Sequence, residues 1–217
     1  MNLIIFGASG HAKVILDIIS ENTSLNPVGI IDNRLEVGKK ILGVDVIGDD
    51  DLMAELTEKY NCKHGVIGVG DNFLRRKIVK SVENLVPDLQ FVNCIHHSAR
   101  ISKNCQLGVG NVIMPGVVIN AGSRVGNHCI LNTNSSLDHD CEMDDYSSLA
   151  PNVGVAGDCR IGSFSKIGIG ASVFPGVKIG SNCIIGGGSV LNRDAKDNAV
   201  YYGVPARYIS ERKLVEK

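Results

Sequence analysis

The sequence predicts a chain of two parts: an α/β domain with a small parallel sheet, followed by a parallel β-helix, which is a solenoid of short strands. Two observations carry this prediction. Residues 1–94 alternate between strand-like and helix-like segments, and an aliphatic residue then recurs at every sixth position from Ile95 to Leu191. A fixed period of six fits neither a helix nor a simple strand, and it is typical of solenoids whose turns bury one another's apolar edges.

The α/β pattern of residues 1–94 consists of apolar strands separated by helices, as in a Rossmann-like parallel sheet. Strands are expected over residues 2–6, 28–31, 65–69 and 89–93, and helices over 11–20, 50–60 and 72–84. After Leu191 the period ends, and we expect residues 192–217 to form a short C-terminal tail.

The hexapeptide region, residues 95–191, also has small residues and turn signals at fixed places. The fourth residue after each aliphatic is usually small, which indicates a narrow interior; these positions are Ala99, Cys105, Ser123, Cys129, Ser135, Cys141, Ser147, Cys159, Ser165, Ala171, Cys183 and Ser189. Pro115, Pro151 and Pro175 are each followed by Gly or Asn, the order of a type II turn. Three hexads per coil then give a triangular prism with eighteen residues per turn.

Composition excludes several classes of function. The net charge is −1, aromatic residues make up 5% of the chain and tryptophan is absent, so neither a basic surface nor a stacking platform for nucleic acid is expected. The sequence shows no apolar run long enough to span a bilayer and no signal peptide, so we expect a cytoplasmic protein without membrane contact. Five of the seven cysteines occupy the small position of the repeat, where each is expected to be buried, and no CxxC pair exists, so no metal is expected.

A glycine turn after the first strand, Gly7 to His11, lies where a phosphate-binding loop precedes a helix. Asp32, after the second strand, has the place of a ribose-reading acid, and Gly70 to Asn72 follow the third. Ser9 replaces a glycine that the dinucleotide pattern requires, so NAD is disfavoured. A tight turn without any ligand is the plain alternative for this loop.

Taken together, these features resemble one group of the hexapeptide-repeat acyltransferases: bacterial N-acetyltransferases of UDP-linked 4-amino sugars, of the bacillosamine type. Sialic acid O-acetyltransferases share the layout. The resemblance rests on GASGH at 7–11, Asp32-Asn33, 70–72, Ile95-His96, ILNT at 130–133, DHDC at 138–141, Ala156-Gly157 and GVPAR at 203–207. It implies a left-handed β-helix, and an N-terminal domain that binds the UDP-sugar through Gly7, Ala8, Ser9, Gly10, His11, Asp32, Asn33, Gly70, Asp71 and Asn72.

His139 is the candidate catalytic base. It lies two positions after inward Leu137 and between Asp138 and Asp140, an arrangement that points its imidazole outward and raises its basicity. From the residues alone, an exposed histidine in a polar corner is the simpler interpretation. The resemblance implies instead that His139 deprotonates the sugar amine, oriented by Asp140. Gly157 lies one eighteen-residue coil later and is the candidate oxyanion donor.

The resemblance also implies acetyl-CoA as cosubstrate and a homotrimer that holds the thioester between neighbouring prisms. The matching acetyl-CoA positions are Asn132, Ser148, Gly157, Ile169, Gly187, Pro205 and Arg207. Ser148 departs from the group, in which a second histidine often occupies this position. Direct transfer is the simplest route, because Cys141, the nearest nucleophile for a ping-pong route, occupies a buried small position.

The predicted function is therefore acetyl-CoA-dependent N-acetylation of a UDP-4-amino-4,6-dideoxy sugar of the 2-acetamido-2,4,6-trideoxyhexose type, for polysaccharide biosynthesis or protein glycosylation. Three alternatives stay open: O-acetylation of a sialic acid or another sugar hydroxyl, a non-catalytic nucleotide-binding scaffold trimer, and a carbonic-anhydrase-like metal site at His128 and His139. His96 and His97 are expected to begin the first coil, and His64 to be solvated.

Overall fold

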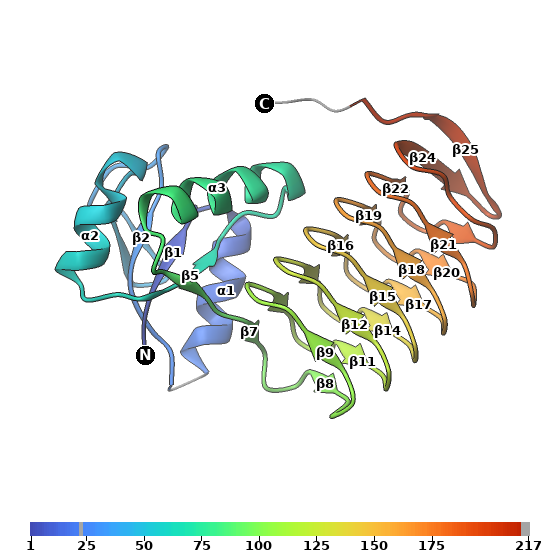
Figure 1. The fold of residues 1–217 in the computed structure, drawn as a ribbon, viewed down its shortest axis with the longest axis horizontal. Coiled ribbons are helices and arrows are strands. Elements are labelled where there is room, and N and C mark those ends of the chain that lie inside the picture. Colours follow the sequence, from blue (N-terminus) through green and yellow to red (C-terminus); the bar gives the residue numbers. More distant parts are fainter. Residues whose placement is uncertain (22–23, 214–217) are drawn as a thin grey trace. The chain divides into compact units, whose positions relative to one another are not determined.

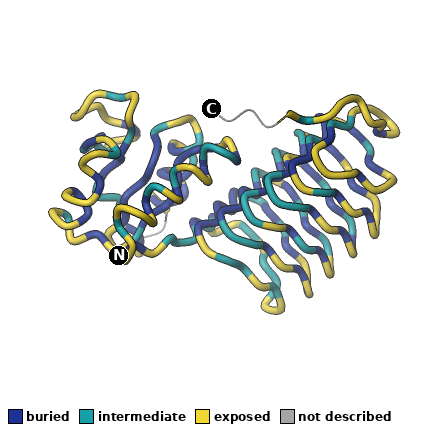
Figure 2. Tube along the Cα trace, turned by 45° about the horizontal axis from the view of Figure 1, so that its top comes forward, coloured by how far each residue is buried: buried dark blue, intermediate teal, exposed yellow. Residues whose placement is uncertain are grey.

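The computed structural model describes residues 1–21 and 24–213, and the chain forms two compact units, residues 1–97 and 98–217. The structure confirms the predicted fold, a Rossmann-like unit followed by a hexapeptide-repeat β-helix (Figure 1). Each unit has its own buried core (Figure 2).

The first unit contains a six-stranded sheet with the order β3-β4-β2-β1-β5-β6. Its strands are β1 (Asn2–Phe6), β2 (Asn26–Ile31), β3 (Lys40–Ile41), β4 (Val44–Gly48), β5 (His64–Ile67) and β6 (Gln90–Phe91). Its helices are α1 (Gly10–Ser20), the short 3₁₀ helix η1 (Asp50–Leu52), α2 (Met53–Lys59) and α3 (Asn72–Leu85). β7 (Cys94–Ile95) ends the unit.

The centre of this sheet is parallel and buried on both faces. β1 pairs with β2 on one side and with β5 on the other, and Leu3, Ile4, Ile5 and Phe6 are all fully buried. The chain leaves β1 towards β2 and returns to the opposite side of β1 at β5. The loops after β1 and β5 therefore lie at the point where the strand order reverses, the place at which such sheets bind ligands.

The hairpin of β3 and β4, which lies at the edge of this sheet, was not predicted from the sequence. Leu42 and Gly43 form its two-residue turn with φ of 45° and 86°, as type I′ hairpins require. Leucine is an uncommon residue at such a φ, so the turn has none of the usual Asn-Gly or Asp-Gly signals.

The second unit is a parallel β-helix with three strands per coil. The first face contains β10 (Val112–Ile113), β13 (Ile130–Leu131), β16 (Ser148–Leu149), β19 (Lys166–Ile167) and β22 (Ile184–Ile185). The second contains β8 (Arg100–Ile101), β11 (Val118–Ile119), β14 (Ser136–Leu137), β17 (Gly154–Val155), β20 (Ser172–Val173) and β23 (Val190–Leu191). The third contains β9 (Gln106–Leu107), β12 (Arg124–Val125), β15 (Glu142–Met143), β18 (Arg160–Ile161) and β21 (Lys178–Ile179).

Strands of successive coils pair in register at a spacing of eighteen residues, as Ser136 with Gly154 and Gly154 with Ser172. Every hexad aliphatic from Ile113 to Leu191 is buried. The small positions from Ser123 to Ser189 are buried as well, but Cys105 is half-buried, so the prediction that all five repeat cysteines are buried is wrong at this one. Cys105 belongs to the first coil of the unit, where Ile101 and Leu107 are also only half-buried.

The predicted proline turns are present at the corners. The residue after Pro115, Pro151 and Pro175 has φ of 71°, 58° and 72° respectively, which is the left-handed conformation of a type II turn and explains why glycine or asparagine follows each proline.

The residues after Leu191, predicted as a tail, instead include an antiparallel hairpin of β24 (Ala199–Gly203) and β25 (Ala206–Glu211). β24 pairs in parallel with β22, so the hairpin extends the first face of the β-helix. In the described part of the chain, no helix is both long and apolar enough to span a bilayer.

Candidate active site

His139 lies at a corner of the β-helix, directly after β14. Leu137 points into the core and is fully buried, while the His139 side chain is 55% exposed. Its backbone N–H donates to Asp138 Oδ1 at 2.8 Å, which closes the corner, and Asp140 follows with φ of 57°. His139 thus belongs to the turn after β14 rather than to the strand, and the turn directs its imidazole outward, as predicted.

The imidazole of His139 is oriented by Asp140. Nδ1 donates to Asp140 Oδ2 at 2.9 Å, which leaves the lone pair on Nε2. This hydrogen bond, with the negative charges of Asp138, Asp140 and Asp158, raises the pKa of His139. A raised pKa makes the neutral ring a stronger proton acceptor.

Two residues that sequence analysis missed support this corner from the neighbouring coils. Asn120 donates to Asp138 Oδ1 at 2.7 Å, and this bond lowers the pKa of the Asp138 carboxyl. Asp158 adds negative charge near His139. Asn120 and Asp158 each lie one eighteen-residue coil from an acid that flanks His139, so the coil spacing was the available signal.

Gly157 lies beside the His139 ring. A Cβ placed on Gly157 would come within 2.5 Å of both Cε1 and Nε2 of His139, so only glycine fits without moving the ring. Its carbonyl accepts from Gly176 N–H, whereas its own N–H has no hydrogen-bond acceptor within residues 1–21 and 24–213. A free backbone donor beside the base suits a developing oxyanion.

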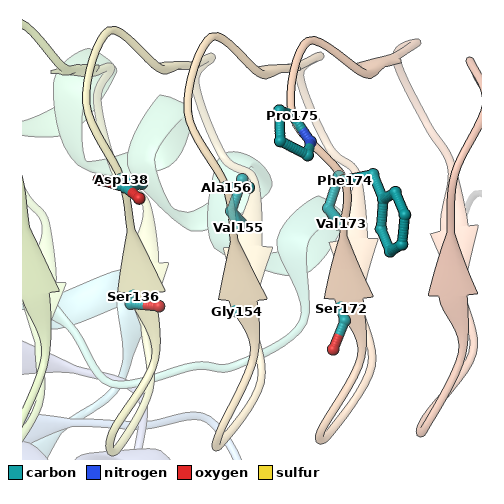
Figure 3. Close-up of a pocket in the computed structure, with 9 residues that line it drawn as sticks. All are labelled: Ser136, Asp138, Gly154, Val155, Ala156, Ser172, Val173, Phe174 and Pro175. Atoms are coloured by element: carbon teal, nitrogen blue, oxygen red, sulfur yellow. The ribbon is translucent and has the colours of Figure 1, made fainter.

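A shallow groove of about 430 Å³ runs along the face of β14, β17 and β20 and reaches this corner (Figure 3). Its lining is mostly small or apolar, with Asp138 on β14's end and Phe174 beyond β20; the complete set is Ser136, Asp138, Gly154, Val155, Ala156, Ser172, Val173, Phe174 and Pro175. Phe174 is 50% exposed although it is a large aromatic residue. The face can therefore accept an apolar portion of a ligand or another protein surface.

The structure places the candidate acetyl-CoA residues at several positions of the second unit. Asn132, Ile169 and Gly187 lie at the corner that precedes the grooved face, and Ile169, 59% exposed, contacts Gly187 across one coil. Ser148 lies on β16 and is buried. Pro205 and Arg207 are exposed in the β24–β25 hairpin, where the Arg207 guanidinium donates to Ala206 O. His139 and Gly157 occupy the opposite edge of the same grooved face.

Cys141 has no access to a substrate. It is fully buried, its Sγ donates to Ala156 O at 3.1 Å, and it lies next to Cys159 of the following coil. The hydrogen bond with Cys159 and burial raise the pKa of the Cys141 thiol. A ping-pong route through this sulfur is therefore disfavoured.

In the first unit, the candidate nucleotide residues gather at the carboxyl ends of β1, β2 and β5. Ser9 caps α1 by accepting from His11 N–H, and its hydroxyl donates to Gly68 O at 2.7 Å, which ties the loops after β1 and β5 together. Gly10 and Gly70 face open space. Asp71 caps α3 by accepting from Phe73 N–H and Leu74 N–H.

Two expected ligand groups are already paired within the unit. Both carboxylate oxygens of Asp32 are used, Oδ2 by Ala8 N–H at 2.7 Å and Oδ1 by Arg34 N–H at 2.9 Å. The Asn33 side chain exchanges two hydrogen bonds with Asp50. In this conformation Asp32 therefore shapes the glycine turn, and a ribose hydroxyl would have to donate to a remaining lone pair of the same two oxygens.

The half-buried His11 and the buried Arg75 lie close to these loops. The Arg75 side chain, which sequence analysis missed, is almost fully buried and donates to Val69 O, Gly70 O and Asn72 Oδ1. Burial and the nearby charge of Arg75 lower the pKa of His11 to about 4, so its ring is neutral at pH 7. His11 Nε2 is buried without a hydrogen-bond partner in the described residues.

Two family models match the chain. The PglD N-terminal domain covers residues 2–82, and the bacterial transferase hexapeptide (six repeats) covers residues 158–193. The chain spans 23% of the length of one curated relative, an uncharacterized protein of Acanthamoeba polyphaga mimivirus, and 77% of another, the GDP-perosamine N-acetyltransferase of Escherichia coli O157:H7, to which it is 26% identical. A third, the UDP-N-acetylbacillosamine N-acetyltransferase of Bacillus subtilis, is 34% identical over 52% of this chain and 51% of its own.

Solved structures match almost the entire chain. PerB from Caulobacter crescentus, in complex with CoA and GDP-perosamine, has a TM-score of 0.90 and 34% identity and covers 97% of this chain and 98% of its own. The acetyltransferase domain of PglB from Neisseria gonorrhoeae, in complex with acetyl coenzyme A, has a TM-score of 0.89 and 30% identity over 96% and 98%. The chain therefore belongs to an enzyme family, the sugar N-acetyltransferases that join a PglD-type N-terminal domain to a hexapeptide-repeat β-helix.

Proposed function

We propose that this protein transfers the acetyl group of acetyl-CoA to the 4-amino group of a nucleotide-linked 4-amino-4,6-dideoxy sugar, with His139 as general base. The observation that carries the proposal is the corner at His139, where a base oriented by Asp140 lies beside the free N–H of Gly157. A base and an oxyanion donor side by side are the two groups that acyl transfer needs.

The reaction is a direct attack. The sugar amine attacks the thioester carbonyl carbon while its proton passes to Nε2 of His139, and Gly157 N–H stabilises the carbonyl oxygen as it becomes negative. The C–S bond then breaks, and CoA leaves as a thiolate that receives the proton from His139. Asp140 keeps Nδ1 as the donor throughout, so that Nε2 is the atom that exchanges the proton.

The proposal also concerns the nucleoside diphosphate to which the acceptor sugar is linked. The sequence predicted a UDP-linked sugar, whereas PerB, which matches along almost the entire chain, is complexed with GDP-perosamine. Both are nucleoside diphosphates linked to 4-amino-4,6-dideoxy sugars. The loops after β1 and β5, with the α1 and α3 N-termini, are the candidate diphosphate site for either acceptor.

The grooved face supports the predicted homotrimer. Asn132, Ile169 and Gly187 occupy one edge of this face and His139 the other, and a single open face cannot exclude water from a thioester. A neighbouring prism packed on Phe174 would cover it. Multi-angle light scattering should give three times the chain mass, and Phe174→Glu should shift the mass to that of one chain; a monomeric wild type would contradict this part of the proposal.

The decisive experiment follows CoA thiol release and product mass with UDP-4-amino sugars, GDP-perosamine and sialic acid. Wild type should add one acetyl group to one of the nucleotide 4-amino sugars, and His139→Ala should lower the rate by a factor of about 10²–10⁴ with its melting temperature retained. Acetylation of sialic acid alone would establish O-acetylation instead. No transfer to any acceptor, with nucleotide binding intact, would favour the scaffold interpretation.

A further inference from the structure

A carboxylate and two imidazoles meet in the first unit, and none of the three belongs to the candidate nucleotide or acetyl-transfer residues. Glu21 follows the last residue of α1, and His96 and His97 directly follow β7. Glu21 Oε2 lies 3.0 Å from His96 Nε2 and 2.7 Å from His97 Nδ1. The three potential ligand atoms all lie within 4.8 Å of one another.

From this cluster we infer a binding site for a divalent transition-metal cation of the Zn²⁺ class, formed by Glu21, His96 and His97. Two imidazole nitrogens and one carboxylate oxygen are a donor set that zinc accepts, with a water molecule at the fourth position. Mg²⁺ and Ca²⁺ are disfavoured because they prefer oxygen ligands.

The geometry fits such an ion with small movements. Zinc holds these atoms at about 2.0–2.2 Å, which separates tetrahedral ligand atoms by about 3.4 Å, so the contacts must open by a few tenths of an ångström. The side chains of Glu21 and His97 are 45% and 69% exposed and can rotate to do so, whereas that of His96 is only 10% exposed and provides a fixed ligand. The two rings lie 4.3 Å apart, tilted by 34°.

Without an ion, one oxygen of Glu21 accepts from both imidazoles at once. An ion would take the place of the two protons that these imidazoles donate, and it would bind the lone pairs of His96 Nε2 and His97 Nδ1 instead. Its binding therefore requires both rings to be neutral. The sequence predicts no metal here because no local motif marks these residues, and Glu21 is far along the chain from His96 and His97.

The ion would join the end of the first helix to the last strand of the same unit, since α1 packs against β7. Binding to the folded state alone stabilises it by mass action. The site therefore has a structural readout that does not depend on acetyl transfer.

The test is calorimetric titration of ZnCl₂ into the chelator-treated full chain. Wild type should bind one Zn²⁺ per chain at this site, and Glu21→Gln and His97→Ala should each weaken that binding by roughly tenfold or more. His64→Ala, a histidine of the same unit outside the cluster, should bind as wild type does. His97→Ala is informative even if Glu21→Gln fails to fold, because His97 is mostly exposed.

Thermal melting with ZnCl₂ gives the second readout. The melting temperature of wild type and His64→Ala should rise with zinc and return with EDTA, while that of His97→Ala should not respond. No zinc uptake by wild type, or equal uptake by His97→Ala, would overturn the site. The acetyltransferase proposal would be untouched by either result, since the assay measures no transfer.

Discussion

The imidazole of His139 lies over the α-carbon of Gly157, so closely that an added Cβ would come within 2.5 Å of two ring atoms. Gly157→Ala should therefore push the ring out of place and lower kcat by about a hundredfold, since displacement of a catalytic group by about 1 Å costs that much. Steady-state kinetics with the acetylated sugar product as readout would measure it.

A double-mutant cycle separates this effect from general damage. If Gly157→Ala acts through His139, it should lower the rate much less in a His139→Ala background than in wild type. Equal losses in both backgrounds, or a collapse of the melting temperature, would mean that the glycine serves the coil rather than the base.

Asp140→Asn should move the pH dependence of the reaction. The hydrogen bond to Asp140 is the largest cause of the raised pKa of His139, so its weakening lowers that pKa. Because the base must be neutral to act, kcat/KM rises with pH through the pKa, and the acid limb of the profile should shift to lower pH in the variant while the plateau falls. An unchanged acid limb would show that another group titrates.

His11 should make the protein less stable in mild acid. Its pKa is about 4 in the folded state and near 6.5 when unfolded, so the unfolded state binds the proton more readily between these values. The free energy of unfolding should therefore fall by about 1–2 kcal/mol from pH 7 to pH 5, measured by urea titration.

His11→Gln is the matched variant for this measurement, because its amide is uncharged at both pH values. Between pH 7 and pH 5 its unfolding free energy should fall less than that of wild type, because most of the decrease that His11 causes is absent. A decrease of the same size in wild type and variant would assign the acid sensitivity to other groups.

Cys141→Ala should keep its acetyltransferase activity. The sulfur is fully buried and bound to Ala156 O, so its removal costs about 1–2 kcal/mol of unfolding free energy and leaves the direct route intact. Loss of transfer in a variant that still melts cooperatively would favour a ping-pong route and an acetylated enzyme detectable by intact mass.

The repeat was predictable to the level of single residues because each hexad position admits only residues of a particular size or backbone conformation. The interior selects aliphatic residues such as Ile113 and small ones such as Ser135, and the corners select Pro followed by a residue of positive φ such as Gly116. The first unit was predictable as strands and helices, but its β3–β4 hairpin was not, because Leu42 gives no turn signal.

Within the candidate sites, the sequence pattern identified the residues at the exposed corners, but it did not identify the hydrogen bonds and buried side chains that support the loops. His139 and Gly157 follow from the hexad position and the coil spacing. The pairing of Asp32 with Ala8 and Arg34, and the burial of Arg75 beneath the loops, depend on how loops fold back on one another, which no local period records.

The register of the coils also limits how this protein can change its length. Removing six residues upstream of His139 would move His139 to a different corner of the triangular prism relative to all earlier coils. Removing eighteen residues would shorten the prism by one coil and keep equivalent residues of successive coils aligned. Natural variation in the number of residues before the base should therefore come in whole coils. A deletion of any other length should destroy the alignment between the coils before it and the coils after it.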